Sequence, residues 1–119
     1  MSFPFRIGLL GSGRMGAIRA THLYSNPRAL LTSILDVNEK AASKLASTYG
    51  INSINDTTDI QGLVVSSPTH THLDAIKEAP DGIPIFLEKP IAEDAKGIRE
   101  GEKREKRKEM KVKGLLYNI

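Results

Sequence analysis

The sequence predicts an α/β protein built on a doubly wound parallel sheet, and three observations support this prediction. Short apolar runs alternate with stretches that can form helices, in the order strand, helix, strand, helix, strand, helix, strand. A glycine-rich turn at residues 11–16 directly follows the first apolar run. The 119 residues, 39% hydrophobic and 26% charged, fit one globular domain and leave no room for a second full domain.

Composition and charge exclude several classes of protein. The chain has no cysteine, so it forms no disulfide, cysteine-based zinc site or thiol nucleophile. It shows neither a signal-peptide apolar region nor a membrane-spanning run, which predicts a cytoplasmic protein without a membrane partner. Residues 1–90 carry eight basic and eight acidic side chains, whereas residues 91–119 carry nine and six, so the net charge of +3 lies entirely in the tail. That tail has no aromatic residue between Phe86 and Tyr117 to stack on bases, and we expect no nucleic-acid partner.

The first half of the chain predicts two strand–helix units. Residues 5–10 form a short apolar run typical of a strand buried on both faces, and residues 13–24 can form a helix that ends before Pro27. A second apolar run, residues 30–35, closes on Asp36. Asn38 can then cap a helix that stops at Gly50. The apolar stripe of this helix consists of Ala41, Ala42, Leu45, Ala46 and Tyr49.

The second half predicts two more strands, near residues 62–65 and 83–87, with a short helix at 71–79 between them. Two stretches break the pattern. Between a plausible third strand at 51–54 and the fourth, seven residues must cover a diagonal of about 22 Å, which leaves no room for a crossover helix. We therefore expect either a vestigial third strand or a stretched, irregular connection.

The second break is the charged tail. Nine of the ten residues from 100 to 109 are charged, so a helix there has no core-facing stripe, and we expect an exposed, mobile segment. Residues 115–119 can make at most one closing strand. We therefore expect a doubly wound α/β domain at 1–95 and a charged tail at 96–119 with a last helix and a short strand.

Gly11, Gly13 and Gly16 form a G-x-G-x-x-G motif between the first strand and the first helix. In a dinucleotide site the first glycine permits the tight turn, the second lets the backbone approach a pyrophosphate, and the third lets the helix pack closely on the strand. The pyrophosphate then lies on the free N–H groups at the helix N-terminus. Alone, the motif is also compatible with an ordinary strand-to-helix turn.

Asp36 gives the glycine motif its context. It ends the second strand and lies 20 residues beyond Gly16, the spacing of the acid that binds the ribose 2′-hydroxyl of NAD. A carboxylate there repels the 2′-phosphate of NADP, and no arginine follows it. A solvated acid at a strand end is the alternative. We predict NAD as the cofactor, with NADP less favoured.

Two further motifs follow the fourth and fifth strands, at the edge where ligands of such sheets bind. They are Ser67-Pro68-Thr69-His70-Thr71-His72 and Glu88-Lys89-Pro90. With Gly11 to Gly16 and Asp36, these residues make the sequence resemble the nucleotide-binding half of the family of glucose–fructose oxidoreductases and inositol 2-dehydrogenases, over about residues 5–95.

The resemblance implies a Rossmann-type domain of an NAD-dependent oxidoreductase that acts on a polyol or sugar hydroxyl. It implies a catalytic role for Lys89, because a lysine with a lowered pKa can bind the substrate oxygen and assist hydride departure. It also places Pro68, His72 and Glu88 around the nicotinamide ribose. We expect no metal site, since His70 and His72 have no third ligand nearby. The expected cofactor-binding residues are Gly11, Ser12, Gly13, Arg14, Met15, Gly16, Asp36, Ser67, Pro68, Thr69, His72, Glu88 and Lys89.

Full-length members of that family continue into a substrate domain, which supplies a histidine and an aspartate to the active site. The resemblance therefore implies an incomplete, truncated chain that lacks this domain, in which turnover by the 119 residues alone is doubtful. Two hypotheses remain open. The chain is either the cofactor-binding part of a polyol or sugar dehydrogenase, with oligomerisation possible, or a non-catalytic remnant that binds nucleotide or a protein partner.

Overall fold

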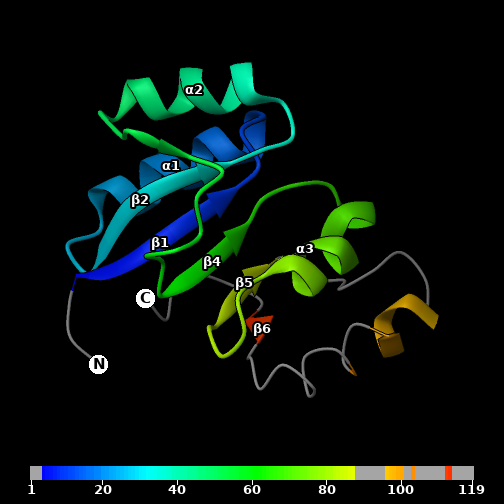
Figure 1. Ribbon diagram of the computed structural model, residues 1–119. Coiled ribbons are helices and arrows are strands. Elements are labelled where there is room, and N and C mark those ends of the chain that lie inside the picture. Colours follow the sequence, from blue (N-terminus) through cyan, green and yellow to red (C-terminus); the bar gives the residue numbers. More distant parts are fainter. Residues whose placement is uncertain (1–3, 88–95, 101–102, 104–111, 114–119) are drawn as a thin grey trace.

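The computed structural model describes residues 4–87, 96–100, 103 and 112–113, and its strands form one all-parallel sheet (Figure 1). The strand order is β3-β2-β1-β4-β5-β6, so the chain winds outward from β1 in one direction and then from β4 in the other. This confirms the predicted doubly wound α/β fold. The strands are β1 (Phe5–Leu10), β2 (Ala29–Leu35), β3 (Ser53–Ile54), β4 (Gly62–Val65), β5 (Ile85–Leu87) and β6 (Val112–Lys113). The helices are α1 (Arg14–Ser25), α2 (Glu39–Thr48), the 3-10 turn η1 (Thr69–Thr71) and α3 (His72–Glu78), and residues 96–100 and 103 are also helical.

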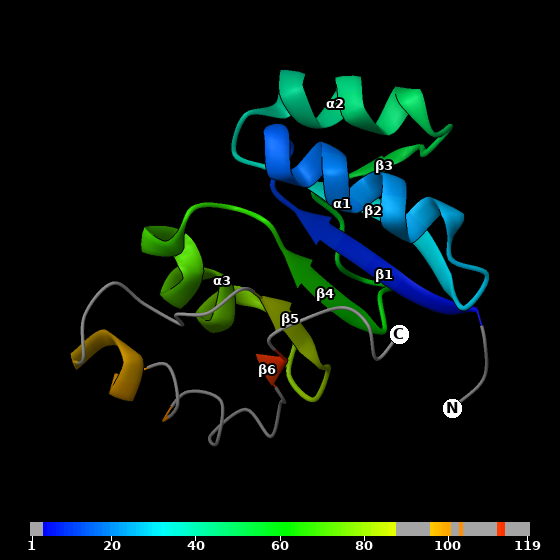
Figure 2. The same cartoon turned by 180° about the vertical axis from the view of Figure 1, so that it is seen from behind.

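The sheet is buried on both faces, as parallel strands require. On one face Ile7 and Leu9 of β1, both fully buried, pack in one core with α1 and α2. On the other face Leu63 and Val65 of β4 pack in a second core with Ile76 of α3. Figures 1 and 2 show α1 behind the strands and α3 in front of them in the first view. Alternate residues of β1, β4 and β5 thus serve opposite cores, which explains why these strands lack an apolar–polar alternation.

The helix α2 forms as its sequence predicts. The side chain of Asn38 accepts a hydrogen bond from the Ala41 N–H at 3.1 Å, and this caps the first turn. Ala42 and Ala46 are buried against β2 and β1. At the other end Gly50 has φ +68°, a left-handed conformation that glycine adopts without steric cost.

The connection from β3 to β4 contains no helix, as expected from its length. The strand β3 has only two residues, which pair with Ser33 and Ile34 of β2. Within the connection Asp56 accepts hydrogen bonds from the N–H and the hydroxyl of Thr58, at 2.9 and 2.7 Å, which form a local turn. Both predicted properties, a vestigial third strand and an irregular connection, are confirmed.

The far edge of the sheet lies partly outside the described residues. The strand β6 pairs in parallel with β5 and begins three residues before the strand expected at 115–119. The structure does not describe residues 115–119. Of the charged stretch at 100–109 only Glu100 and Lys103 are described, and both are helical. The domain boundary at residue 95 and the exposure of the tail therefore stay predictions.

Candidate nucleotide-binding site

The glycine turn between β1 and α1 is closely packed at two of its three glycines. Gly11 has φ +109°, and a Cβ there would lie 2.9 Å from the backbone of Ser66 and Ser67. A Cβ on Gly16 would lie 2.0 Å from the carbonyl oxygen of Gly11. A Cβ on Gly13, in contrast, would meet nothing within 4 Å. The protein itself therefore requires glycine at 11 and 16, whereas the open space over Gly13 fits a ligand that approaches the backbone there.

The N-terminus of α1 offers free donors at this turn. The first backbone bond of the helix runs from the Ala17 N–H to the Gly13 carbonyl at 2.9 Å, which leaves the preceding N–H groups without helical partners. In the described part of the chain no side chain caps this helix, and its first turn carries no acid. This end of α1 thus differs from that of α2, which Asn38 caps, and it favours an anion.

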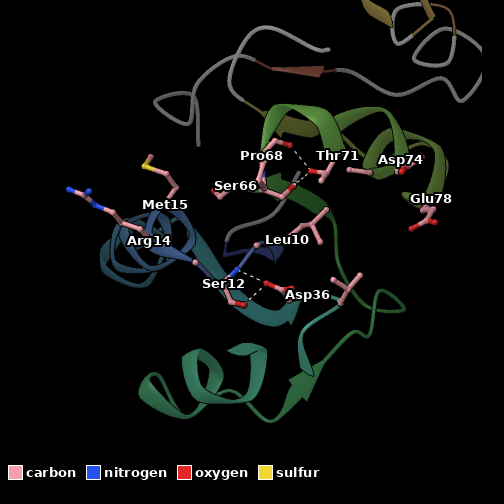
Figure 3. Close-up of a pocket in the computed structure, with 15 residues that line it drawn as sticks. Leu10, Ser12, Arg14, Met15, Asp36, Ser66, Pro68, Thr71, Asp74 and Glu78 are labelled. Atoms are coloured by element: carbon pink, nitrogen blue, oxygen red, sulfur yellow. Dashed lines mark hydrogen bonds between the residues drawn. The ribbon is translucent and has the colours of Figure 1, made fainter. Parts of the chain in front are cut away.

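Asp36 lies beside the glycine turn and is held by several hydrogen bonds. Its Oδ2 accepts from the Ser12 N–H at 2.9 Å and from the Ser12 hydroxyl at 2.5 Å (Figure 3). Its Oδ1 accepts from the Asn38 N–H at 2.9 Å, and its own N–H donates to the side chain of Asn55 at 2.9 Å. The sequence spacing predicted that Asp36 and the turn lie together, and the structure brings them into direct contact.

These contacts keep the Asp36 carboxyl ionised. Burial by itself raises its pKa, but hydrogen bonds from the Ser12 hydroxyl and from the N–H groups of Asn38 and Ser12 outweigh this effect. The net result is a pKa below the ordinary value of 3.8. At neutral pH the site therefore presents a negative charge beside the turn.

A cavity of about 630 Å³ extends from the glycine turn across the end of β4. Figure 3 shows Arg14 and Met15 on one side of it, with Asp74 and Glu78 of α3 on the opposite side. Arg14 is the only cation among its described lining residues. A second cavity of about 640 Å³ continues from Asp36 and is lined by Leu10, Leu35, Asp36, Val37, Asn38, Glu39, Asn55 and Glu78.

The segment after β4 contributes part of this wall. Ser67 and Pro68 line the first cavity, as does Thr71, whose hydroxyl lies 2.6 Å from the Pro68 carbonyl oxygen. Thr69 and His72, both predicted to bind cofactor, are not among the lining residues. His72 is only 2% exposed, and its Nε2 lies 3.2 Å from the Ser67 carbonyl oxygen, so it supports the segment from behind.

The predicted residues Glu88 and Lys89 lie outside the described residues. The strand β5 ends one residue before them, and its last residue pairs with Val65 at the end of β4. Their part in the site stays a prediction. Gly16 is described but does not line the cavity, since it packs against the backbone of Gly11.

Several lining residues were not predicted from the sequence. Leu10, Val37 and Ser66 directly adjoin predicted positions, and Asp74, Ala75 and Glu78 come from α3. Their spacing along α3, at 74, 75 and 78, marks one helical face, and this was the available signal. Which face of α3 meets the cavity, however, depends on packing against β4 and β5.

The described residues contain no group of three or more histidine, cysteine, aspartate or glutamate side chains that could hold a metal ion. Among the same residues, no helix is both long and apolar enough to cross a bilayer.

Comparisons with known proteins agree with this geometry. Residues 5–113 match the model of an oxidoreductase family described as an NAD-binding Rossmann fold. The chain is 40% identical over 100 residues to an inositol 2-dehydrogenase of Rhizobium meliloti, covering 79% of this chain and 30% of that protein. It thus spans about a third of the length of this relative.

Two solved structures are also similar. One is a putative myo-inositol dehydrogenase of Sinorhizobium meliloti, with a TM-score of 0.81 and 34% identity, covering 91% of this chain and 35% of the other. The second is a scyllo-inositol dehydrogenase of Lactobacillus casei with bound NAD(H) and scyllo-inositol, with a TM-score of 0.78 and 25% identity over the same shares. The chain therefore belongs to the family of glucose–fructose oxidoreductases and inositol dehydrogenases, of which it carries the NAD-binding Rossmann domain.

Proposed function

We propose that this chain binds NAD as the cofactor domain of an oxidoreductase that acts on a polyol or sugar hydroxyl. One observation carries the cofactor part of the proposal: the Asp36 carboxylate is hydrogen-bonded to Ser12 inside the glycine turn. A diphosphate bound at the turn and a ribose bound at the carboxylate would then be neighbouring parts of one nucleotide in a single cavity. The name and the bound cofactor of the Lactobacillus casei protein support the same reading of the site.

The diphosphate would lie over Gly13 at the N-terminus of α1. The open space there, the uncapped N–H groups and the nearby Arg14 side chain all favour a negatively charged group. The ribose of the adenosine would donate to Asp36. When bound, NAD would supply the carbon that accepts a hydride from the substrate.

NAD is favoured over NADP because of the charges around Asp36. Glu39 and Glu78 line the second cavity together with Asp36, and among the described residues of that cavity there is no lysine or arginine. A ribose 2′-phosphate would meet carboxylates and no cation. The preference for NAD therefore depends mainly on the charge of Asp36, and the negative charges of these two glutamates add to the repulsion of a 2′-phosphate.

Isothermal calorimetry with NAD and NADP tests this proposal. We expect NAD to bind at least about tenfold more tightly, which corresponds to about 1.4 kcal/mol. Asp36→Asn keeps the shape of the side chain but removes its charge. It should weaken NAD binding and narrow the difference in affinity between NAD and NADP. Asp59→Asn is the matched control, because Asp59 precedes β4 and so lies near the N-terminal ends of the strands, away from the glycine turn. Equal affinities for the two cofactors in the wild type would contradict the proposal.

The catalytic part of the proposal concerns Lys89. Oxidation of an alcohol requires the hydroxyl proton to leave as the hydride departs, and a lysine at the substrate oxygen can assist this step. Because Lys89 follows β5 by two residues, it comes after a strand whose end lies beside that of β4. Pro68 and Glu88 would lie near the nicotinamide ribose, with His72 behind the segment at the Ser67 carbonyl. The comparisons do not favour the alternative of a non-catalytic remnant, since the similar proteins carry the names of dehydrogenases.

A further inference from the structure

The contacts of Asp36 assign a distinct task to Ser12. A carboxylate has about four positions that can accept a hydrogen bond, two on each oxygen. Both positions of Oδ2 are filled by Ser12, one by its N–H and one by its hydroxyl. On Oδ1 the Asn38 N–H fills one position. Only Oδ1 therefore retains an acceptor position, and this decides which oxygen a ribose can use.

We propose that Ser12 is a positioning residue, which fixes Oδ2 of Asp36 so that Oδ1 is presented to the ribose of the nucleotide. This inference rests on the proposed NAD-binding function and extends it to one side chain. The two contacts from Ser12 hold the carboxylate in one rotamer before the nucleotide arrives. Less side-chain freedom is then lost on binding, which is the general advantage of a preorganised site.

The backbone supports the same arrangement. The Gly11 N–H donates to the Leu35 carbonyl at 2.9 Å, which ties the glycine turn to the end of β2 one residue before Asp36. Asn55 holds the Asp36 N–H from the other side. Only the side-chain torsions of Asp36 remain to be fixed, and Ser12 supplies contacts that fix them. The serine hydroxyl donates its single hydrogen to Oδ2, so it cannot also donate a hydrogen bond to the ligand.

Other charged groups around Asp36 do not replace Ser12. The cavities around it are lined by Arg14 of α1, Glu39 of α2, and Asp74 and Glu78 of α3. Burial raises the pKa of Asp36, and the hydrogen bonds that lower it come from Ser12 and Asn38, with the Ser12 hydroxyl the largest of these contributions.

The test uses Ser12→Ala, Ser12→Thr and a control, Ser25→Ala, which removes a hydroxyl hydrogen bond at the other end of α1. The first measurement is the pKa of the Asp36 carboxyl by NMR in the free protein. Ser12→Ala should raise this pKa, because a hydrogen bond to the charged form is lost. Ser12→Thr, which keeps the hydroxyl, and Ser25→Ala should leave it unchanged.

The second measurement is the affinity for ADP-ribose by calorimetry across acid pH. Ser12→Ala should weaken binding about three- to tenfold at neutral pH, and Ser12→Thr should restore it. Binding requires ionised Asp36, so it is present above the pKa and lost as the pH falls through it. The midpoint of that loss should therefore move upward in Ser12→Ala.

The outcomes separate this inference from the proposed function. An unchanged Asp36 pKa in Ser12→Ala would overturn the inference, as would a raised pKa with unchanged affinity for ADP-ribose. If the wild type binds neither ADP-ribose nor NAD, the proposed function is wrong. The NMR titration then still decides whether Ser12 positions the carboxylate.

Discussion

At the scale of single residues, the three glycines of the turn have different reasons to be glycine. Gly16 is required by the fold, because a Cβ there would lie 2.0 Å from a backbone oxygen. Gly13 has φ −80° and ψ −156°, which other residues also adopt, and a Cβ there would be free of contacts. The motif gives the third glycine a packing role and the second a role in ligand approach, and the structure shows close packing at Gly16 and open space at Gly13.

This difference predicts opposite results for two alanine substitutions. Gly16→Ala should destabilise the fold by about 3 kcal/mol, because backbone atoms cannot move aside cheaply. Gly13→Ala should leave stability unchanged or raise it slightly, but weaken NAD binding about tenfold or more, because the methyl group occupies the space where a diphosphate approaches. Thermal unfolding and calorimetry on both variants check this. A Gly13→Ala protein with unchanged NAD affinity would argue against a diphosphate at this position.

At the scale of elements, the sequence predicted the parts that depend on local rules. The helix α2 begins and ends where Asn38 and Gly50 place it, because capping is a matter of neighbouring residues. The irregular connection before β4 follows from the reach of seven residues alone. The spacing predicted that Asp36 lies beside the turn, but the hydrogen bonds between Asp36 and Ser12 were not predicted. The face that α3 turns to the cavity was not predicted either, because it depends on packing.

The strand β2 carries one polar side chain that neither sequence nor function explains. Ser33 is 2% exposed, and its hydroxyl has no hydrogen-bond partner among the described residues. It lies where the pairing of β1 with β2 shifts register, between Ile7 and Gly8. The strand thus buries a polar group that gains nothing from burial.

Replacing this hydroxyl should stabilise the protein. We expect Ser33→Ala to raise the free energy of unfolding by about 1 kcal/mol, because an unsatisfied buried group is removed and the cavity left is small. Urea unfolding of the two proteins measures the difference. Ser33→Thr, which retains the hydroxyl and adds a methyl group to a packed site, is the matched comparison and should not stabilise. A destabilised Ser33→Ala protein would reveal a partner for the hydroxyl.

At the scale of the whole molecule, the winding of the sheet creates the site. Because all strands are parallel and the order turns outward on both sides of β1 and β4, the turns after β1, β2 and β4 meet at one edge (Figure 1). The residues that line the first cavity come from the end of β1, from these turns, from the start of α1 and from α3. Residues that are far apart in the sequence therefore meet in the structure. This is why their spacing in the sequence alone predicted that the acid at 36 lies beside the motif at 11–16.

The same view leads to a prediction about activity. We expect the purified 119-residue chain to bind NAD but not to oxidise inositol or other polyols at rates typical of dehydrogenases, about 1 to 1,000 per second. The hydroxyl proton needs an acceptor within hydrogen-bond reach, with a pKa near the working pH. In the described part of the cavity wall the acids are Asp36, whose carboxylate Ser12 and Asn38 hold, and Asp74 and Glu78 of α3, on the side opposite Arg14 and Met15 (Figure 3). His72 is buried against the Ser67 carbonyl.

An assay of NADH production over a panel of polyols and sugars tests this, in the same preparation whose NAD binding calorimetry has established. Without that binding, a lack of turnover would say nothing about the proton acceptor. Lys89→Ala serves as the comparison, because any turnover that depends on the proposed site must fall when the lysine is removed. Turnover within the dehydrogenase range that disappears in Lys89→Ala would show that these 119 residues supply both the cofactor site and a working proton acceptor.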